Sequence, residues 1–454
     1  MKTTHRATFG GRLSAVLVTA GSAVGLGNIW RFPYVAGENG GGAFLLIYIL
    51  SVLLLGVPIM LSEFAIGRNT HRNAVGAYRT LSSRWSILGY NSILAPLLIM
   101  GFYLVVSGWT LEYMIHSLTG EFTRISTPEA YESLFNAFTQ NPWKPLLYTV
   151  VFTLLTHGVI ALGVQKGIER SARIMMPLLL LILVVLAVHS ILLPGGTEGV
   201  KFLFAPDFSK VTPSTVLTAL GQAFFSLSIG LGCLVTYASY FKNDTNITHT
   251  ALQVAFIDTL VAVLAGLVIF PAVFSVGIEP TAGPSLVFVT LPAIFNTLPL
   301  SMVWSTIFFL LLVIAALTST ISLHEVLTVY VQEEWHLSRR AAAWIVTGRY
   351  LSARRRDARR QTAPAGHQPQ GCGRLFELRQ PDRSGHDPRA RNLSSRLRGQ
   401  AVGGGSRGGS REGRKRAARN ACRGRRGAAA GRPHGARRLR RRDRFLQIAQ
   451  PHVA

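Results

Sequence analysis

Residues 20–44 decide the fold, and they read AGSAVGLGNIWRFPYVAGENGGGAF. Glycines, an asparagine and an arginine interrupt a run that is otherwise apolar enough to cross a bilayer. In hydrocarbon an unpaired backbone group is costly, so non-helical backbone is tolerated there only where it lines a cavity or a ligand site. Gly21, Gly25 and Gly27 permit such a break. The break would expose carbonyl oxygens suited to a hard cation and N–H groups suited to an anion.

The same glycines have a second explanation. Gly21 and Gly25 have the four-residue spacing with which small residues let two membrane helices approach closely. Taken alone, residues 20–44 fit close packing and ligand binding equally well.

A second interrupted span favours a binding site. Residues 221–240 read GQAFFSLSIGLGCLVTYASY and cluster Ser226, Ser228, Gly230 and Gly232 in mid-membrane. Two interrupted helices, five spans apart, indicate an inverted-repeat secondary transporter with its site at the bilayer midplane.

Composition agrees with a membrane protein. Of the 454 residues 49% are hydrophobic, and the mean hydropathy is +0.31. Eight apolar runs are long enough to cross a bilayer: 12–36, 42–67, 88–119, 145–164, 172–193, 213–241, 250–277 and 302–331. Residues 339–348 resemble the first half of a ninth span, so we predict a transporter core over residues 1–348.

Basic residues predict the orientation, because connections rich in lysine and arginine face the cytoplasm. They precede the first span and fill every second connection: Lys2, Arg6, Arg12, Arg68, Arg72, Arg79, Arg84, Lys166, Arg170, Arg173, Lys242, Arg339 and Arg340. The amino terminus is therefore expected inside. Residues 278–301 are too apolar for a solvated loop and predict a short helical hairpin over the outer face.

The tail differs from the core in charge. Residues 1–348 carry a net charge of +3 and residues 349–454 carry +23, with 28 arginines to one lysine. This arginine, glycine, alanine and proline bias is what GC-rich DNA yields in a wrong frame, so we hypothesise a frameshift near codon 348. The alternative is a disordered arginine-rich tail that binds RNA or acidic lipid. Cys233, Cys372 and Cys422 form no disulfide framework or zinc spacing.

Residues 20–44 and 221–240, together with AALTSTISL at 315–323, resemble the neurotransmitter:sodium symporter family, particularly its bacterial amino-acid transporters. The similarity runs through residues 6–347. It implies an all-α membrane protein with an inverted-repeat fold of five plus five helices and broken helices 1 and 6, here truncated after about helix 8. It also implies sodium-coupled amino-acid symport across the bacterial inner membrane by alternating access, without enzymatic activity. The expected partners are an amino acid and the lipid bilayer, with nucleic acid only if the tail is genuine; the oligomeric state stays open.

The resemblance implies two sodium sites. One takes the carbonyls of Gly21, Val24 and Ala315 and the hydroxyls of Thr318 and Ser319. The other takes the Ala23 carbonyl, Asn28, Ser226 and Asp258. Hydroxyls in a helix also bond back to carbonyls, which is the ordinary explanation of Thr318 and Ser319. Asp258 is the only acid of its span, and a buried acid indicates function, although an edge position would also explain it. A fixed carboxylate there implies that chloride is not required.

The resemblance also implies the substrate pocket. Its residues are Ser22, Ala23, Gly25, Leu26, Gly27, Ile99, Tyr103, Phe225, Ser226, Ser228, Leu231, Ser319 and Leu323. Gly25 stands where monoamine carriers have an aspartate, which favours an α-amino acid. Leu231 replaces a phenylalanine of some members and leaves room for a larger apolar or aromatic substrate, whereas simple helix packing would explain the apolar residues equally.

Gating residues are implied in part. Arg31 matches an extracellular-gate arginine whose acidic partner lies on a tenth helix that this chain lacks. Arg6, Phe9 and Glu333 match the cytoplasmic gate, with a possible pair between Arg6 and Glu333. Two other readings stay open: a sodium-dependent binding protein or sensor, and an inactive product with a basic tail that binds nucleic acid.

Overall fold

The computed structural model describes residues 7–125, 127–276 and 287–361, all within one compact unit, residues 1–369. This part of the chain contains helices and no β-strand. The helices of the first half are α1 (Arg12–Ala23), η1 (Gly27–Arg31), α2 (Phe32–Glu38), α3 (Gly42–Ser51), η2 (Val52–Gly56), α4 (Val57–Thr70), α5 (Ala74–Leu81), η3 (Ser83–Trp85), α6 (Ser86–Leu118), η4 (Phe122–Arg124), α7 (Pro128–Gln140) and α8 (Lys144–Ala161). The remaining helices are η5 (Val164–Glu169), α9 (Arg170–Ile191), α10 (Gly196–Phe204), η6 (Phe208–Lys210), α11 (Pro213–Ser226), α12 (Cys233–Ala238), α13 (Ile247–Ser275), α14 (Thr290–Asn296), α15 (Ser301–Glu334) and α16 (Arg339–Gln361).

Six of the described helices are long and apolar enough to cross a membrane: Gly42–Thr70, Ser83–Leu118, Lys144–Ala161, Val164–Ile191, Ile247–Ser275 and Ser301–Glu334. The first span is a seventh if its two halves, bent by 50°, are counted together. The remaining predicted run is divided between α11 and α12, with 14 and 6 residues, and each half is shorter than a bilayer crossing needs.

The first break begins where α1 ends. Val24 is extended, with a ψ of 114°, and helical geometry resumes in the π-helical turn η1. Gly25 has to lack a side chain, because a Cβ there would lie 2.1 Å from Ser319 Oγ on α15. The close approach of α15 therefore fixes the break at this glycine.

The second break separates α11 from α12. Gly230 and Gly232 have positive φ angles of 77° and 71°, which glycine adopts without the steric cost of a side chain. The freed N–H of Gly230 donates to Glu63 Oε1 of α4 at 2.7 Å. Both predicted breaks are present, and a buried carboxylate stabilises the second one.

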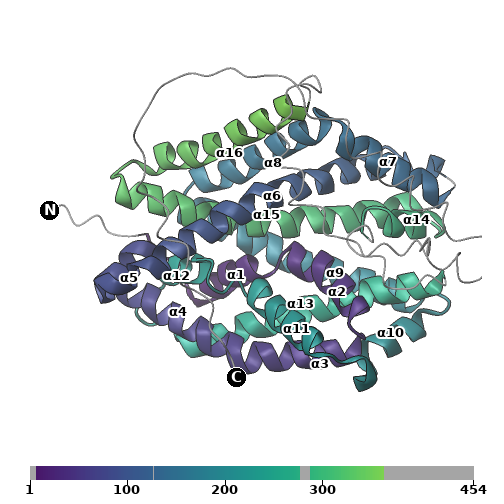
Figure 1. Cartoon of the computed structure of the whole chain (residues 1–454), viewed down its shortest axis with the longest axis horizontal. Helices are drawn as coiled ribbons and strands as arrows, with labels where there is room; N and C mark the ends of the chain where they lie inside the picture. Colours follow the sequence, from purple (N-terminus) through teal and green to yellow (C-terminus); the bar gives the residue numbers. More distant parts are fainter. Residues whose placement is uncertain (1–6, 126, 277–286, 362–454) are drawn as a thin grey trace, which may run out of the picture. The chain divides into compact units, whose positions relative to one another are not determined.

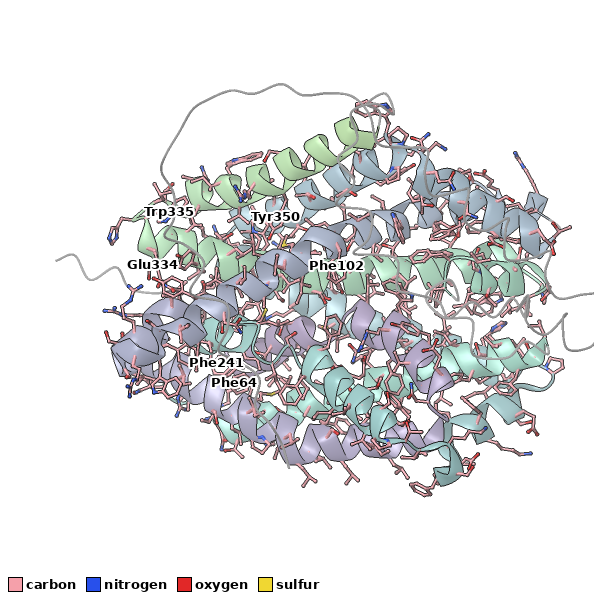
Figure 2. All side chains as sticks on the ribbon, in the orientation of Figure 1. Phe64, Phe102, Phe241, Glu334, Trp335 and Tyr350 are labelled. Carbon is pink, nitrogen blue, oxygen red and sulfur yellow. The ribbon has the colours of Figure 1, made fainter. Side chains whose placement is uncertain are left out.

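Long helices surround the breaks. α15 packs along α6 and α8, and α16 lies against α8 and α15, as Figure 1 shows. α12 packs on α4, where Phe64 and the nearby Phe241 meet edge to face with ring centroids 5.3 Å apart (Figure 2). The two halves of each broken span are thereby held between continuous helices.

One expectation needs correction, and another is tested only in part. The sequence predicts half a span over residues 339–348 and a core that ends at residue 348, but α16 continues to Gln361, because arginine, alanine and leucine there favour a helix already started. The rest of the predicted disordered tail, residues 362–454, lies outside the described residues. Of the hairpin predicted over residues 278–301, the structure has one short helix, α14, and residues 277–286 lie outside the described part.

Candidate functional site

The two breaks meet α6 and α15 around a cavity of about 30 Å³. Most predicted pocket residues line it: Ser22, Ala23, Gly25, Gly27, Ile99, Tyr103, Phe225, Ser228, Leu231, Ser319 and Leu323. Leu26 and Ser226 are not among the lining residues: the Leu26 N–H donates to Tyr103, which does line the cavity, and Ser226 contacts Asp258. Cys233 and Ser322 line it although the sequence did not indicate them.

Side chains satisfy the backbone groups that the first break frees. The N–H of Leu26 donates to the Tyr103 hydroxyl at 2.9 Å. Ser228 Oγ donates to the carbonyl of Ser22 at 2.8 Å, which ties the second break to the first. The breaks therefore form one polar wall, and α6 supports it through a phenol.

A fully buried carboxylate lies beside this wall. Asp258 Oδ1 accepts from Asn28 Nδ2 and Ser226 Oγ, each at 2.8 Å, and Oδ2 accepts from the Tyr48 hydroxyl at 2.9 Å. Asp258 is completely inaccessible to solvent, so the edge position considered above is wrong. We call Asn28, Tyr48, Ser226 and Asp258 the carboxylate cluster.

Asn28 differs from the expected ligand in one respect. Its Nδ2 faces Asp258, because a carboxylate accepts hydrogen bonds, and its Oδ1 accepts from the N–H of Gly25 at 3.2 Å. Rotating the amide by 180° would present the oxygen to the same place. Asn28 thus has the position of the expected ligand but presents its nitrogen there.

A second group of oxygens joins α1 to α15. Thr318 Oγ1 lies 2.9 Å from the Ala315 carbonyl and 3.2 Å from the Val24 carbonyl. Ser319 Oγ lies 3.5 Å from the Val24 carbonyl. A Cβ on Gly21 would contact the Thr318 side chain at 3.8 Å. We call Gly21, Val24, Ala315, Thr318 and Ser319 the hydroxyl cluster. Thr318 makes the ordinary bond back to a carbonyl of its own helix, and both hydroxyls also contact the Val24 carbonyl across the break.

Both clusters fit a hard monovalent cation. The hydroxyl cluster offers only neutral oxygens, and the carboxylate cluster offers hydroxyls and one carboxylate. Oxygen donors of this kind replace the hydration shell of an alkali ion. Among the described residues no group of three or more histidine, cysteine or acidic side chains could hold a metal ion.

Arg31 closes the cavity at one end. Its Nη1 donates to Gln222 Oε1, and its guanidinium lies 5.5 Å from the ring centroid of Phe225. Gln222 Nε2 in turn donates to the carbonyl of Gly27 at 2.9 Å. Arg31 is therefore fastened across the two broken helices by Gln222, a residue that the sequence reading missed.

The other end is closed by aromatic rings and buried polar contacts. Phe9 packs against Tyr237 and Tyr240 with ring centroids 6.2 and 5.6 Å apart. The Tyr237 hydroxyl donates to Ser322 Oγ at 2.9 Å, and the Tyr240 hydroxyl donates to Glu325 Oε1 at 2.7 Å. These contacts fasten α12 to α15 below the cavity.

Arg6 lies outside the described residues, so its pair with Glu333 stays a prediction. Glu333 Oε2 accepts from the backbone N–H and the amide of Asn73, at 2.8 and 2.9 Å. The neighbouring Glu334 pairs with Arg79 at 3.2 Å, and this hydrogen bond raises the pKa of the Arg79 guanidinium. Both acids thus fasten the end of α15 to α5.

Sequence reasoning also missed Tyr48 and Glu63. Glu63 had a usable signal, because an acid within a span is costly unless it has a role. Tyr48 had none, since a tyrosine in the apolar run GGAFLLIYIL reads equally well as packing. Its contact with Asp258 joins residues 210 positions apart.

Comparison with known proteins agrees with this geometry. The model of the sodium:neurotransmitter symporter family matches residues 6–134 and 140–351. A sodium-dependent transporter of Bacillus subtilis is 43% identical over 335 residues, which are 73% of this chain and 74% of the relative. A sodium-dependent transporter of Haemophilus influenzae is 40% identical over 360 residues, 76% of this chain and 79% of the relative.

The crystal structure of MhsT in complex with L-phenylalanine is similar, with a TM-score of 0.73 and 43% identity over 78% of this chain and 80% of that one. The predicted all-α, inverted-repeat transporter fold with broken helices 1 and 6 is thereby confirmed. Because the family model spans both breaks and α15, the chain belongs to the sodium:neurotransmitter symporter family, whose members are sodium-dependent transporters.

Proposed function

We propose that the protein couples sodium entry to the import of an apolar or aromatic α-amino acid across the bacterial inner membrane. The convergence of both breaks and α15 on one cavity carries this proposal. The cavity has apolar side chains on one side, Ile99, Leu231 and Leu323, and the polar backbone of the first break on the other. MhsT, which is 43% identical over 78% of this chain, was crystallised in complex with L-phenylalanine.

The amino group and carboxylate of the substrate would lie against the first break. Ser319 Oγ and Tyr103 Oη approach this break closely at Gly25, where a Cβ would lie 2.1 and 2.8 Å from them, so both hydroxyls lie within reach of a group bound there. A cavity of about 30 Å³ holds about two waters. Lining side chains such as Leu231 and Phe225 therefore have to move when a phenylalanine-sized substrate enters.

Two sodium ions would be carried, one at each cluster. The carboxylate cluster supplies its own negative charge through Asp258, which supports transport without chloride. The hydroxyl cluster would hold its ion through neutral oxygens, so that binding there depends on how closely Val24 approaches Thr318 and Ser319. Each ion would link a broken helix to a continuous one. The carboxylate cluster joins η1 and α11 to α13, and the hydroxyl cluster joins the end of α1 to α15.

Alternating access would break one of the two closures at a time. The basic connections favour an orientation with the amino terminus and the Phe9 contacts in the cytoplasm, and with Arg31 and Gln222 outside. The protein would then exchange a state closed by Arg31 and Gln222 for one closed by Tyr240 and Glu325.

Uptake into proteoliposomes tests the proposal. We expect radiolabelled L-phenylalanine or L-leucine to accumulate under an inward sodium gradient, and not with lithium or potassium. Equal uptake in all three cations would refute sodium coupling. Sodium-dependent binding without accumulation would instead identify a binding protein or sensor.

We also propose that residues beyond about 349 are read in a shifted frame. The family model stops matching at residue 351, where the arginine-rich composition begins. Sequencing the coding DNA tests this. Long apolar segments in another frame after codon 348 would support the shift, and their absence would support a genuine basic tail.

A further inference from the structure

An ionisable group that the transport site does not use lies at the end of α6. His116 Nε2 lies 2.9 Å from Glu112 Oε1, and His116 Nδ1 hydrogen-bonds to Glu121 Oε2 in the turn before η4. Glu112 is buried in the helix, whereas the Glu121 side chain is half exposed. We call these three residues the His116 clasp.

With both acids ionised, the geometry of the clasp requires a charged imidazole. An ionised carboxylate oxygen only accepts hydrogen bonds, so a ring nitrogen facing one has to carry hydrogen. Both ring nitrogens of His116 face carboxylate oxygens, and only the imidazolium has two N–H groups. A neutral ring would turn a lone pair toward one of the two acids.

One metal ion cannot replace this proton. The two nitrogens point to opposite sides of the ring, and each contacts a different carboxylate. A single ion would reach only one nitrogen and its own acid. A proton satisfies both contacts at once.

Few other charges face the clasp. Lys144 Nζ, at the start of α8, is 4.0 Å from Glu112 Oε1, and Tyr148 of α8 lies near Glu112. Tyr113 of α6 lies edge-on to the imidazole with ring centroids 6.1 Å apart. Glu112 Oε2 has no hydrogen-bond partner among the described residues. Two negative carboxylates therefore face two positive groups, one lysine and the imidazolium. Loss of the imidazolium proton leaves one negative charge in excess.

Aromatic contacts connect the clasp to the first break. The imidazole packs on Phe122 of η4, with ring centroids 6.0 Å apart. Phe122 contacts Tyr113, which contacts Phe288, which in turn contacts Trp30 of η1 at 6.0 Å. Trp30 immediately precedes Arg31. A continuous aromatic layer thus runs from η4 to the closure above the cavity.

We propose that His116 is a proton-binding site whose proton fastens η4 to α6 and holds the aromatic layer over the cavity. The clasp forms while the imidazole is charged and the acids are ionised, and it is lost as the pH rises and His116 loses its proton. The effect of this proton on the stability of the protein does not depend on the proposed function. Its effect on uptake rests on the proposed function and orientation.

Thermal unfolding of the full-length protein in detergent tests the clasp. Between about pH 6 and about pH 8.5, a range that spans histidine titration, we expect the wild-type midpoint to fall by roughly 3 °C. His116→Gln, which has donors on one atom only and does not titrate, should remove most of this fall. His249→Gln, an exposed histidine on α13, is the matched control and should retain the wild-type fall.

Glu121→Gln keeps the proposal testable if His116→Gln does not fold. It should lower the midpoint at about pH 6 and leave it unchanged at about pH 8.5, because the contact it weakens is absent there. A wild-type slope retained in either variant would overturn the proposal. Failure of all sodium-driven uptake, with the expected unfolding slopes, would refute the transport function and leave the clasp standing.

Discussion

The carboxylate cluster and the hydroxyl cluster flank the same cavity and use opposite chemistry. Asp258 provides a full charge that accepts hydrogen bonds from three side chains, whereas Thr318 and Ser319 provide only dipoles directed at the carbonyls of Val24 and Ala315. A charged site depends on keeping its compensating donors in place, because an unpaired buried group is costly. A neutral site depends on distance alone. The two clusters should therefore respond very differently to single substitutions.

The largest effect is expected at the carboxylate cluster. Asp258→Ala leaves the Tyr48 and Asn28 donors without an acceptor and removes the charge that would hold an ion. We expect sodium-driven amino-acid uptake to fall by at least about 100-fold, since breaking a buried charged network costs about 3–5 kcal/mol. Initial rates in proteoliposomes measure this. Asp207→Ala, at an exposed acid in a loop, should keep the wild-type rate.

The hydroxyl cluster should respond more weakly. Thr318→Ala or Ser319→Ala removes one neutral oxygen, and we expect about tenfold weaker sodium activation, corresponding to about 1.4 kcal/mol. The sodium concentration for half-maximal uptake measures it. Ser305→Ala, on the same helix but bonded to the Met302 carbonyl alone within the described part of the chain, is the control. A loss as severe as that of Asp258→Ala would contradict the difference between the clusters.

The sequence predicted the features that produce a local signal and missed those that depend on distant contacts. Both breaks, Asp258 and the Thr318–Ser319 pair are local signals, since glycine, acid or hydroxyl residues stand out in apolar runs. Tyr48 and Gln222 became apparent only in the structure, because their partners lie 210 and 191 residues away. The orientation of the Asn28 amide depends on which neighbours are acceptors, and that too requires three dimensions.

Glu63 sharpens the comparison as a second buried acid with fewer donors. Only the N–H of Gly230 reaches its Oε1, and Oε2 has no partner among the described residues. Glu63→Gln keeps the accepting oxygen, so we expect uptake to change by no more than about threefold, or about 0.65 kcal/mol. Glu63→Ala, which removes the acceptor, should cost more. Equal losses in the two variants would mean that the charge, and not the contact with the second break, is what matters.

The smallest effect is expected from removing chloride. Because Asp258 already supplies a fixed negative charge, replacing chloride with gluconate should leave sodium-driven uptake unchanged. In Asp258→Asn the shape is preserved and the charge is lost, so any residual uptake should increase when chloride is added back. Wild-type uptake that requires chloride would contradict the role of this carboxylate.

Equilibrium binding of radiolabelled L-phenylalanine to the purified protein, titrated with sodium, tests the central claim most directly. If two clusters hold two ions beside one cavity, the curve should be sigmoidal, with a Hill coefficient approaching about two, and Thr318→Ala should shift it to higher sodium. Binding that is equal in sodium and potassium would contradict the account.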